Sequence, residues 1–154
     1  MAAPSAVQFY ANNIDLLKLA DLTGVTIKLL LTTSTYTPNT TETGHTVLAD
    51  ITNELANGNG YTTGGATIAT PTITAITGGF KFTTGNASWL ASGSGIPAWR
   101  YGVIYVSGAL WGITSPLIGY FTGDSAPADV PLTAAGNTLQ INCPSNGWIT
   151  DTRV

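Results

Sequence analysis

The chain has 154 residues, of which 44% are hydrophobic, so it is long and apolar enough for one domain with a substantial core. Only 8% of the residues are charged, against about 25% in a typical soluble domain, and the formal net charge is −3. The five Lys and Arg residues are scattered along the sequence, which argues against nucleic-acid binding, and the single cysteine, Cys143, excludes an internal disulfide framework.

The low charge leaves two interpretations open. A surface of Thr, Ser, Asn and Gly suits a protein packed against neighbours, and it equally suits an ordinary extracellular β-domain. The N-terminal sequence lacks a basic segment followed by an apolar run, so we expect no signal peptide. No window of about 18 apolar residues predicts a membrane span. The combination favours a subunit made in a cytosol and then assembled.

The N-terminal part predicts an arm, a helix and a first strand. Residues 1–12 are small and polar and include Pro4, which predicts an arm that is ordered only by a neighbouring chain, with an arm folded back on its own domain as the alternative. Residues 13–21 carry apolar positions behind Asn caps and predict one short helix. Residues 25–34 are β-branched and apolar and predict a strand, whereas 46–55 fit either a helical turn or a strand.

The remainder of the chain has the pattern of an all-β domain. Short segments with period-two alternation or a high content of β-branched and aromatic residues are separated by Gly, Pro and Asn; they are 66–76, 80–85, 98–108, 115–123 and 137–144. The sequence therefore predicts a mainly β fold, a single antiparallel β-sandwich or barrel-like domain of about seven or eight strands over residues 13–154.

The glycine-rich stretch 57–65, NGNGYTTGG, is predicted to be a turn region. A phosphate-binding loop needs a Lys after its glycines or a helix behind them, and neither follows here. Asn-Gly pairs accept positive φ angles, so they suit a corner that leads into the strand after it. We expect no ligand in this stretch.

No group of residues predicts catalysis. His45 is the only histidine, and although Glu42 and Asp50 lie near it in sequence, no nucleophile motif accompanies them. Asp124 and Asp129 share one loop, where they either bind Ca²⁺ weakly or simply solubilise the loop. We predict no enzyme, no catalytic residue, no cofactor and no metal site.

The aromatic residues are the remaining candidates. They are predicted to fill the core or a subunit interface, with a sugar-stacking face as the alternative; the set is Trp89, Trp99, Tyr101, Tyr105, Trp111, Tyr120 and Trp148. In the strand at 98–108, alternation predicts Trp99, Tyr101, Val103 and Tyr105 on one face, towards the core.

Several segments in order resemble a family of small virion structural proteins of tailed bacteriophages. The segments are IKLLLTTSTYTPN, LADITNELANGNGYTTGGATI, ASW, WRYGVIYV, SPLIGYF and LTAAGNTLQI, and the resemblance covers roughly residues 14–142. They are turn and core patterns, so the resemblance implies a shared fold and assembly context and no activity. The chain departs from the pattern at residues 122–136 and in a C-terminal extension at about 143–154.

The resemblance implies a capsid decoration, cement or minor capsid protein. Such a protein would be made in the host cytoplasm, would reside in the virion as a homo-oligomer, and would contact the major capsid protein or other virion proteins, without nucleic acid or membrane. The alternative is a tail, neck-fibre or receptor-facing protein that binds a host surface glycan. A glycan hydrolase would require a pair of acids that the sequence does not offer.

Overall fold

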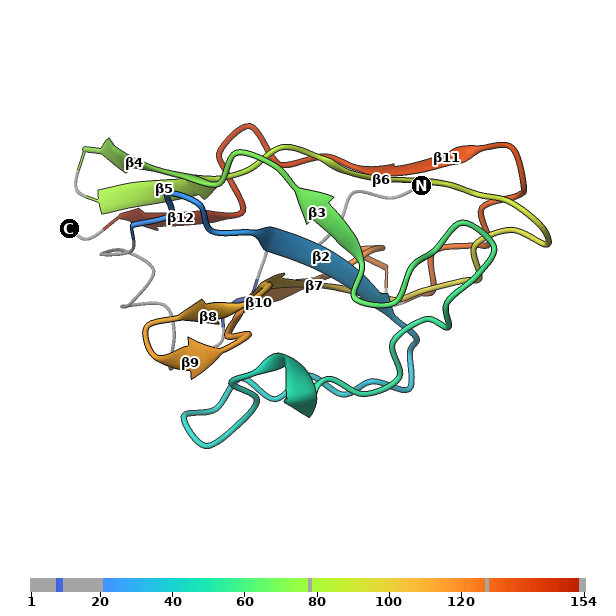
Figure 1. The fold of residues 1–154 in the computed structure, drawn as a ribbon, viewed down its shortest axis with the longest axis horizontal. Helices are drawn as coiled ribbons and strands as arrows, with labels where there is room; N and C mark the ends of the chain where they lie inside the picture. Colours follow the sequence, from blue (N-terminus) through green and yellow to red (C-terminus); the bar gives the residue numbers. More distant parts are fainter. Residues whose placement is uncertain (1–7, 10–20, 78, 127, 153–154) are drawn as a thin grey trace.

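The computed structural model describes residues 8–9, 21–77, 79–126 and 128–152, and these form a mainly β, sandwich-like domain with antiparallel sheets (Figure 1). The strands are β1 (Gln8–Phe9), β2 (Ile27–Thr32), β3 (Ala66–Ile68), β4 (Thr72–Ile76), β5 (Gly79–Thr83), β6 (Ala87–Leu90), β7 (Tyr101–Val106), β8 (Ala109–Leu110), β9 (Ile113–Thr114), β10 (Leu117–Thr122), β11 (Thr138–Ile141) and β12 (Ile149–Thr152). One 3₁₀ turn, η1, spans Leu48–Asp50. The predicted fold class is confirmed as a sandwich, and these sheets do not close into a barrel.

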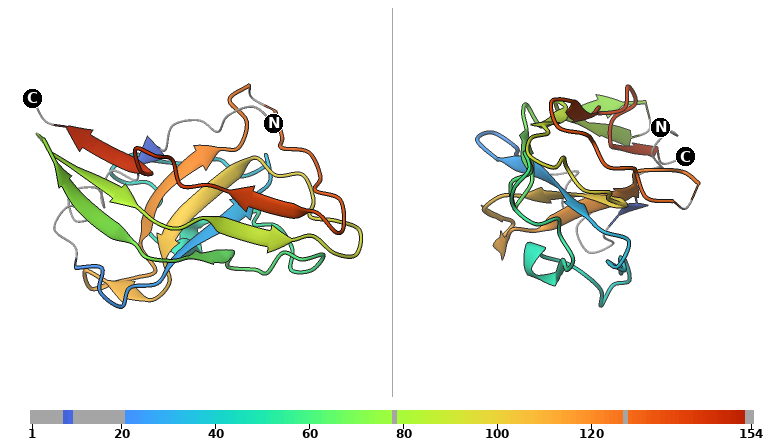
Figure 2. Two further views of the ribbon diagram at one scale, coloured as in Figure 1. Left: turned by 90° about the horizontal axis from the view of Figure 1, so that it is seen from above. Right: turned by 90° about the vertical axis from the view of Figure 1, so that its right-hand side faces the viewer.

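Two layers build the sandwich. One is a five-stranded sheet in the order β1-β10-β7-β2-β3, and the other combines the sheet β12-β5-β4 with the pair β11-β6 (Figures 1 and 2). In the second layer β5 leads directly into β6, and β11 leads through a loop into β12. This layer is therefore one long ribbon with β4 added along part of its edge. The hairpin β8-β9 projects from the first layer.

The main core lies between the two layers. It is built from alternate residues of the facing strands, such as Leu29 and Ile104 from the first layer and Phe82, Trp89 and Ile149 from the second. Apolar burial at about 25 cal/mol per Å² makes this interface the chief source of stability.

The side of the five-stranded sheet that faces away from the main core is covered as well. A second buried cluster there consists of Leu30, Tyr36, Val103, Tyr105 and Leu117, with Leu48 and Ile51 of the 33–55 segment packed against it. Both faces of β2 and β7 are consequently buried, which explains why these strands read as continuous apolar runs.

The structure corrects the predicted face of Trp99. Val103 and Tyr105 lie in the second cluster, with Tyr101 packed against it, whereas Trp99 belongs to the main core on the opposite side of the sheet, with Ile104. Regular strand pairing of β7 begins only at Tyr101, so the alternation does not extend back to Trp99.

Element boundaries differ from the sequence prediction in several places. The segment 66–76 is split into β3 and β4, because Thr70 has a φ of 50° and Pro71 follows it. The ambiguous segment 46–55 contains the 3₁₀ turn rather than a strand, and Asp50 caps it by accepting hydrogen bonds from the backbone N–H groups of Thr46 and Val47. Twelve strands are assigned in the described ranges, more than predicted, because several contain only two to four residues.

Both ends of the chain contribute strands. Gln8 and Phe9 pair with β10 of the same chain, so for these two residues the prediction that a neighbouring chain orders the arm is wrong, and the alternative, an arm folded back on its own domain, holds. The helix predicted at 13–21 lies, apart from Asp21, outside the described residues. Within the C-terminal extension, β12 pairs with β5, and Trp148 is buried in the main core.

Candidate interface surface

The second layer presents an open, nearly uncharged outer face. Cross-strand register identifies its members, because residues directly opposite each other in an antiparallel pair share a face. Lys81 lies opposite both Thr74 and Thr150, Ser88 lies opposite Gln140, and Leu90 lies opposite Thr138. We call this set the outer face; it comprises Thr72, Thr74, Ile76, Lys81, Thr83, Ser88, Leu90, Thr138, Gln140, Thr150 and Thr152.

The chemistry of the outer face is that of a contact surface. Lys81 is its only charged member, and hydroxyl or amide groups make up most of the rest. Leu90 is 65% exposed and is the most exposed large hydrophobic side chain among the described residues. A face of this kind offers hydrogen-bond donors and acceptors around an apolar anchor, with only one ionised group to desolvate.

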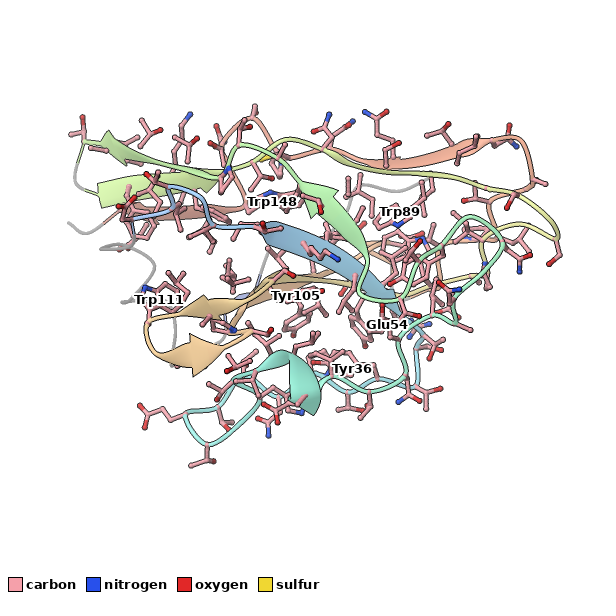
Figure 3. The ribbon with its side chains drawn as sticks, viewed as in Figure 1. Tyr36, Glu54, Trp89, Tyr105, Trp111 and Trp148 are labelled. Atoms are coloured by element: carbon pink, nitrogen blue, oxygen red, sulfur yellow. The ribbon has the colours of Figure 1, made fainter. Side chains whose placement is uncertain are left out.

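The predicted aromatic candidates are mostly inside the protein. Trp89 and Trp148 lie in the main core and Tyr105 in the second cluster (Figure 3). Trp99 also belongs to the main core. The ring of Phe121 stacks on Trp148 at 5.5 Å between centroids and meets Trp99 edge to face at 6.4 Å. The indole N–H of Trp148 donates to Thr84 Oγ1 at 2.7 Å, whereas those of Trp89 and Trp99 have no hydrogen-bond partner among the described residues.

Trp111 occupies the turn of the β8-β9 hairpin. Its φ is 56° and that of Gly112 is 75°, so both central residues of this two-residue turn are left-handed. A bulky side chain is rare in this conformation, which costs roughly 1 kcal/mol. Trp111 is half-buried and packs against the main core, and this contact holds it there.

The half-buried tyrosines Tyr101 and Tyr120 form a small aromatic group on the first layer. Their rings meet at 6.0 Å, and Tyr101 contacts Tyr36 at 5.8 Å, both nearly perpendicular. The Tyr36 hydroxyl lies 2.9 Å from His45 Nδ1, and the two rings are stacked. This is the only place where members of the predicted aromatic set combine partial exposure with mutual contact in the described part of the chain.

The glycine-rich stretch forms turns, as predicted. Gly58 and Tyr61 exchange two backbone hydrogen bonds around Asn59 and Gly60, which have φ angles of 55° and 94°. A two-residue hairpin turn with both φ angles positive is the arrangement that Asn-Gly favours. A second turn closes where the N–H of Gly65 donates to the carbonyl of Thr62.

Hydrogen bonds to the carboxylate of Glu54 link this corner to the rest of the sandwich. Glu54 Oε1 accepts hydrogen bonds from the Tyr61 hydroxyl and from the Gly64 N–H, and the Tyr105 hydroxyl donates to the Gly64 carbonyl at 2.7 Å. Burial raises the pKa of the Tyr61 phenol well above its usual value and raises the pKa of Tyr105 to about 12. Both phenols therefore stay protonated at neutral pH and serve as structural donors.

The acids and the histidine of the sequence prediction serve local structure. The N–H groups of Thr46 and Val47 hold the pKa of Asp50 below its usual value. Asp129 forms an ion pair with Arg100 at 2.8 Å, and Asp124 accepts a hydrogen bond from the Ala126 N–H. No cluster of three or more His, Cys, Asp or Glu side chains suited to a metal occurs within the described ranges, and no helix there is long and apolar enough to cross a membrane.

The outer face was not selected from the sequence, although its signal is present. Thr recurs at alternate positions in 70–74 and again in 150–152, and Leu90 follows the apolar Trp89. Alternation shows that such residues share a face, but only the pairing of distant strands shows that these short segments lie on one continuous surface.

No family model matches the chain, and no curated protein or solved structure matches it either.

Proposed function

We propose that this protein is a structural component of a bacteriophage virion, most specifically a decoration or cement protein that binds the assembled head. The observation that carries the proposal is the outer face, most of whose members are exposed and of which Lys81 is the only charged member. In this proposal the face packs against the major capsid protein or another virion protein, and the chain performs no catalysis.

The chemistry of the outer face supports permanent contact. A stable interface of standard size buries about 800 Å² on each partner, and charged residues are depleted at its centre. Thr, Ser and Gln side chains pair with backbone groups of a partner at little desolvation cost, and Leu90 supplies an apolar anchor. A surface with so little charge is poorly suited to a high free concentration and well suited to an assembled state.

The sequence resemblance supports the same context. The segments that carry it include the buried strands β2, β7 and β10 and the corner held by Glu54, which are the parts of a chain that preserve a fold, together with parts of β6 and β11 in the second layer. The protein would be made in the host cytoplasm and would then reside in the virion.

Copy number in the intact particle tests the proposal. Purified virions of the phage that encodes this chain are analysed by quantitative mass spectrometry against the major capsid protein, and labelled antibody locates the chain by electron microscopy. A decoration protein is expected in hundreds of copies distributed over the head. Absence from purified virions would refute any virion role.

The second candidate is a tail, neck-fibre or receptor-facing virion protein that binds glycan. The partly exposed pair Tyr101 and Tyr120 favours it, since aromatic faces stack on sugar rings. A few to some dozens of copies, located at the tail or neck, would support this candidate and contradict decoration.

A pair of variants tests the role of the outer face directly. Leu90→Asp places a charge on the outer face, and Leu132→Asp places the same charge at a 52% exposed leucine in the connection between β10 and β11. Added to particles that lack the chain, Leu90→Asp is expected to lose most binding and Leu132→Asp to retain it. Equal binding by both variants would exclude the outer face as the contact.

A further inference from the structure

The strand β4 (Thr72–Ile76) forms one edge of the second layer (Figure 2). It pairs with β5 on one side, and no described strand pairs with its other side. Alternate residues of an edge strand direct their backbone N–H and C=O groups outwards, so such an edge is a template for a further strand.

This edge lacks the charges that usually prevent pairing between proteins. No charged residue occurs between Glu54 and Lys81 in the sequence, so β4 itself and the turns before and after it carry none. In space, Asp21 of the segment before β2 lines a surface pocket with Pro71, Thr72 and Ile73 at the start of the strand. The opposite edge strand, β12, carries Asp151, and the edge strands of the five-stranded sheet have only two and three residues. Natural edges are commonly protected by charge or shortness, and β4 has neither protection.

The inward side of β4 also leaves apolar surface uncovered. Ala75 lies opposite Phe80, which is only 4% exposed, yet Ala75 itself is exposed and Ile73 is half-buried. The uncharged strands β6 and β11 of the two-stranded sheet differ, because their inward residues are already buried; these are Ala87, Trp89, Leu139 and Ile141. A strand placed beside β4 would therefore bury apolar side chains as well as pair backbone groups.

We propose that two copies of this chain pair through β4 in antiparallel fashion, about a two-fold axis at Thr74. The strand is self-complementary in this register: Thr72 lies opposite the partner's Ile76, and Ile73 lies opposite the partner's Ala75. Pro71 limits the pairing to these five residues, because it has no N–H to donate. The interface is isologous, as in most homodimers.

The pairing joins two three-stranded sheets into one sheet of six strands. The two-fold axis is perpendicular to the sheet, because directly opposite residues of an antiparallel pair share a face. Both outer faces then point the same way, so the dimer presents a doubled contact surface and gains from bivalent binding to a lattice. The pairing itself does not depend on the proposed virion role.

Sedimentation equilibrium of the purified chain over a concentration series tests the proposal. The wild type is expected to dimerise. Thr74→Lys places two like charges opposite each other at the axis, and is expected to raise the dissociation constant at least tenfold. Thr138→Lys is the control, because it places the same charge on an uncharged edge strand that is not proposed to pair, β11, and it is expected to dimerise like the wild type. Circular dichroism checks that each variant is folded.

A charge-pair variant tests the register. Thr72→Lys combined with Ile76→Glu brings Lys opposite Glu twice across the axis, whereas within one strand the two positions are about 13 Å apart. This variant is expected to dimerise, and to do so less tightly as salt is raised. A wild type that remains monomeric throughout the series would overturn the proposal. A folded Thr74→Lys variant that dimerises as tightly as the wild type, or a monomeric charge-pair variant, would overturn it equally.

Discussion

The hydroxyl of Tyr61 donates a hydrogen bond to Glu54 Oε1 at 2.7 Å and accepts one from the Leu31 N–H at 3.0 Å. Through these two bonds a side chain from the glycine-rich corner joins a loop carboxylate to the central strand β2. Glu54 also accepts from the Gly64 N–H at 2.6 Å. The corner is therefore tied to the buried part of the sheet by polar contacts in addition to its glycine turns.

Removal of the Tyr61 hydroxyl is expected to destabilise the fold. In Tyr61→Phe the buried N–H of Leu31 loses its acceptor and Glu54 loses a donor, so we expect a loss of about 2 to 3 kcal/mol in the free energy of unfolding. Glu54→Gln keeps an acceptor oxygen and should cost about 1 kcal/mol. Urea denaturation measures both, and a larger loss in Glu54→Gln than in Tyr61→Phe would contradict this assignment.

Alkaline pH is expected to unfold the protein through the same tyrosines. Burial raises the pKa of Tyr61, and it raises the pKa of Tyr105 to about 12, whereas both phenols ionise near pH ~10 in the unfolded chain. The unfolded state thus releases protons that the folded state retains. The stabilisation is fully present below pH ~10 and is lost as pH rises towards the folded pKa values.

The measurement is the free energy of unfolding between pH ~8 and ~11.5, compared with Tyr105→Phe. The variant should be less stable at pH ~8, because it loses the bond to the Gly64 carbonyl, but its stability should fall less steeply above pH ~10. Parallel curves for the two proteins would show that Tyr105 ionises equally in both states.

Gly65 is expected to tolerate no side chain. Its φ is 74°, and a Cβ atom there would collide with the backbone carbonyl of Leu29 in β2. Gly65→Ala should therefore cost about 3 kcal/mol or more. Gly136 has a similar φ of 83°, but an added Cβ atom would meet no described atom within 4 Å, so Gly136→Ala should cost only about 1 kcal/mol. Thermal denaturation distinguishes the two, and equal losses would mean that conformation alone governs both sites.

Local sequence predicted the strands whose burial is strongest. β2, β7 and β10 are runs of apolar and β-branched residues because both of their faces are covered, and no tertiary information is needed to recognise them. The turn at Asn59-Gly60 was predictable for a similar reason, since positive φ angles restrict the residue types.

The segments 66–76, 80–85 and 137–144 were also predicted as strands, and they overlap β3, β4, β5 and β11. Two strands that were not predicted, β6 and β12, are defined by distant partners. β6 and β12 have four residues each, and β12 includes an Asp, so neither has a pattern that stands out. β12 is a strand because Ile149 lies opposite Phe82, nearly seventy residues away, where it completes the core. The candidate surface was missed for the same reason: Ser88 and Gln140 become neighbours only after β6 and β11 pair.

Trp99 provides the most direct test of the core. It is 2% exposed, it meets Phe121 edge to face, and its indole N–H has no hydrogen-bond partner among the described residues. Trp99→Ala removes the whole ring and should cost about 3 to 5 kcal/mol through the cavity that it leaves. Trp99→Phe keeps an aromatic ring and removes a buried donor without a partner, so it should cost only about 1 to 2 kcal/mol. Equilibrium urea unfolding measures both values, with Trp111→Ala as the comparison, since that ring is only half-buried. We expect Trp111→Ala to cost less than Trp99→Ala by at least about 1 kcal/mol. A loss below about 1 kcal/mol for Trp99→Ala would place this ring at the surface and would revive a ligand-binding role for it.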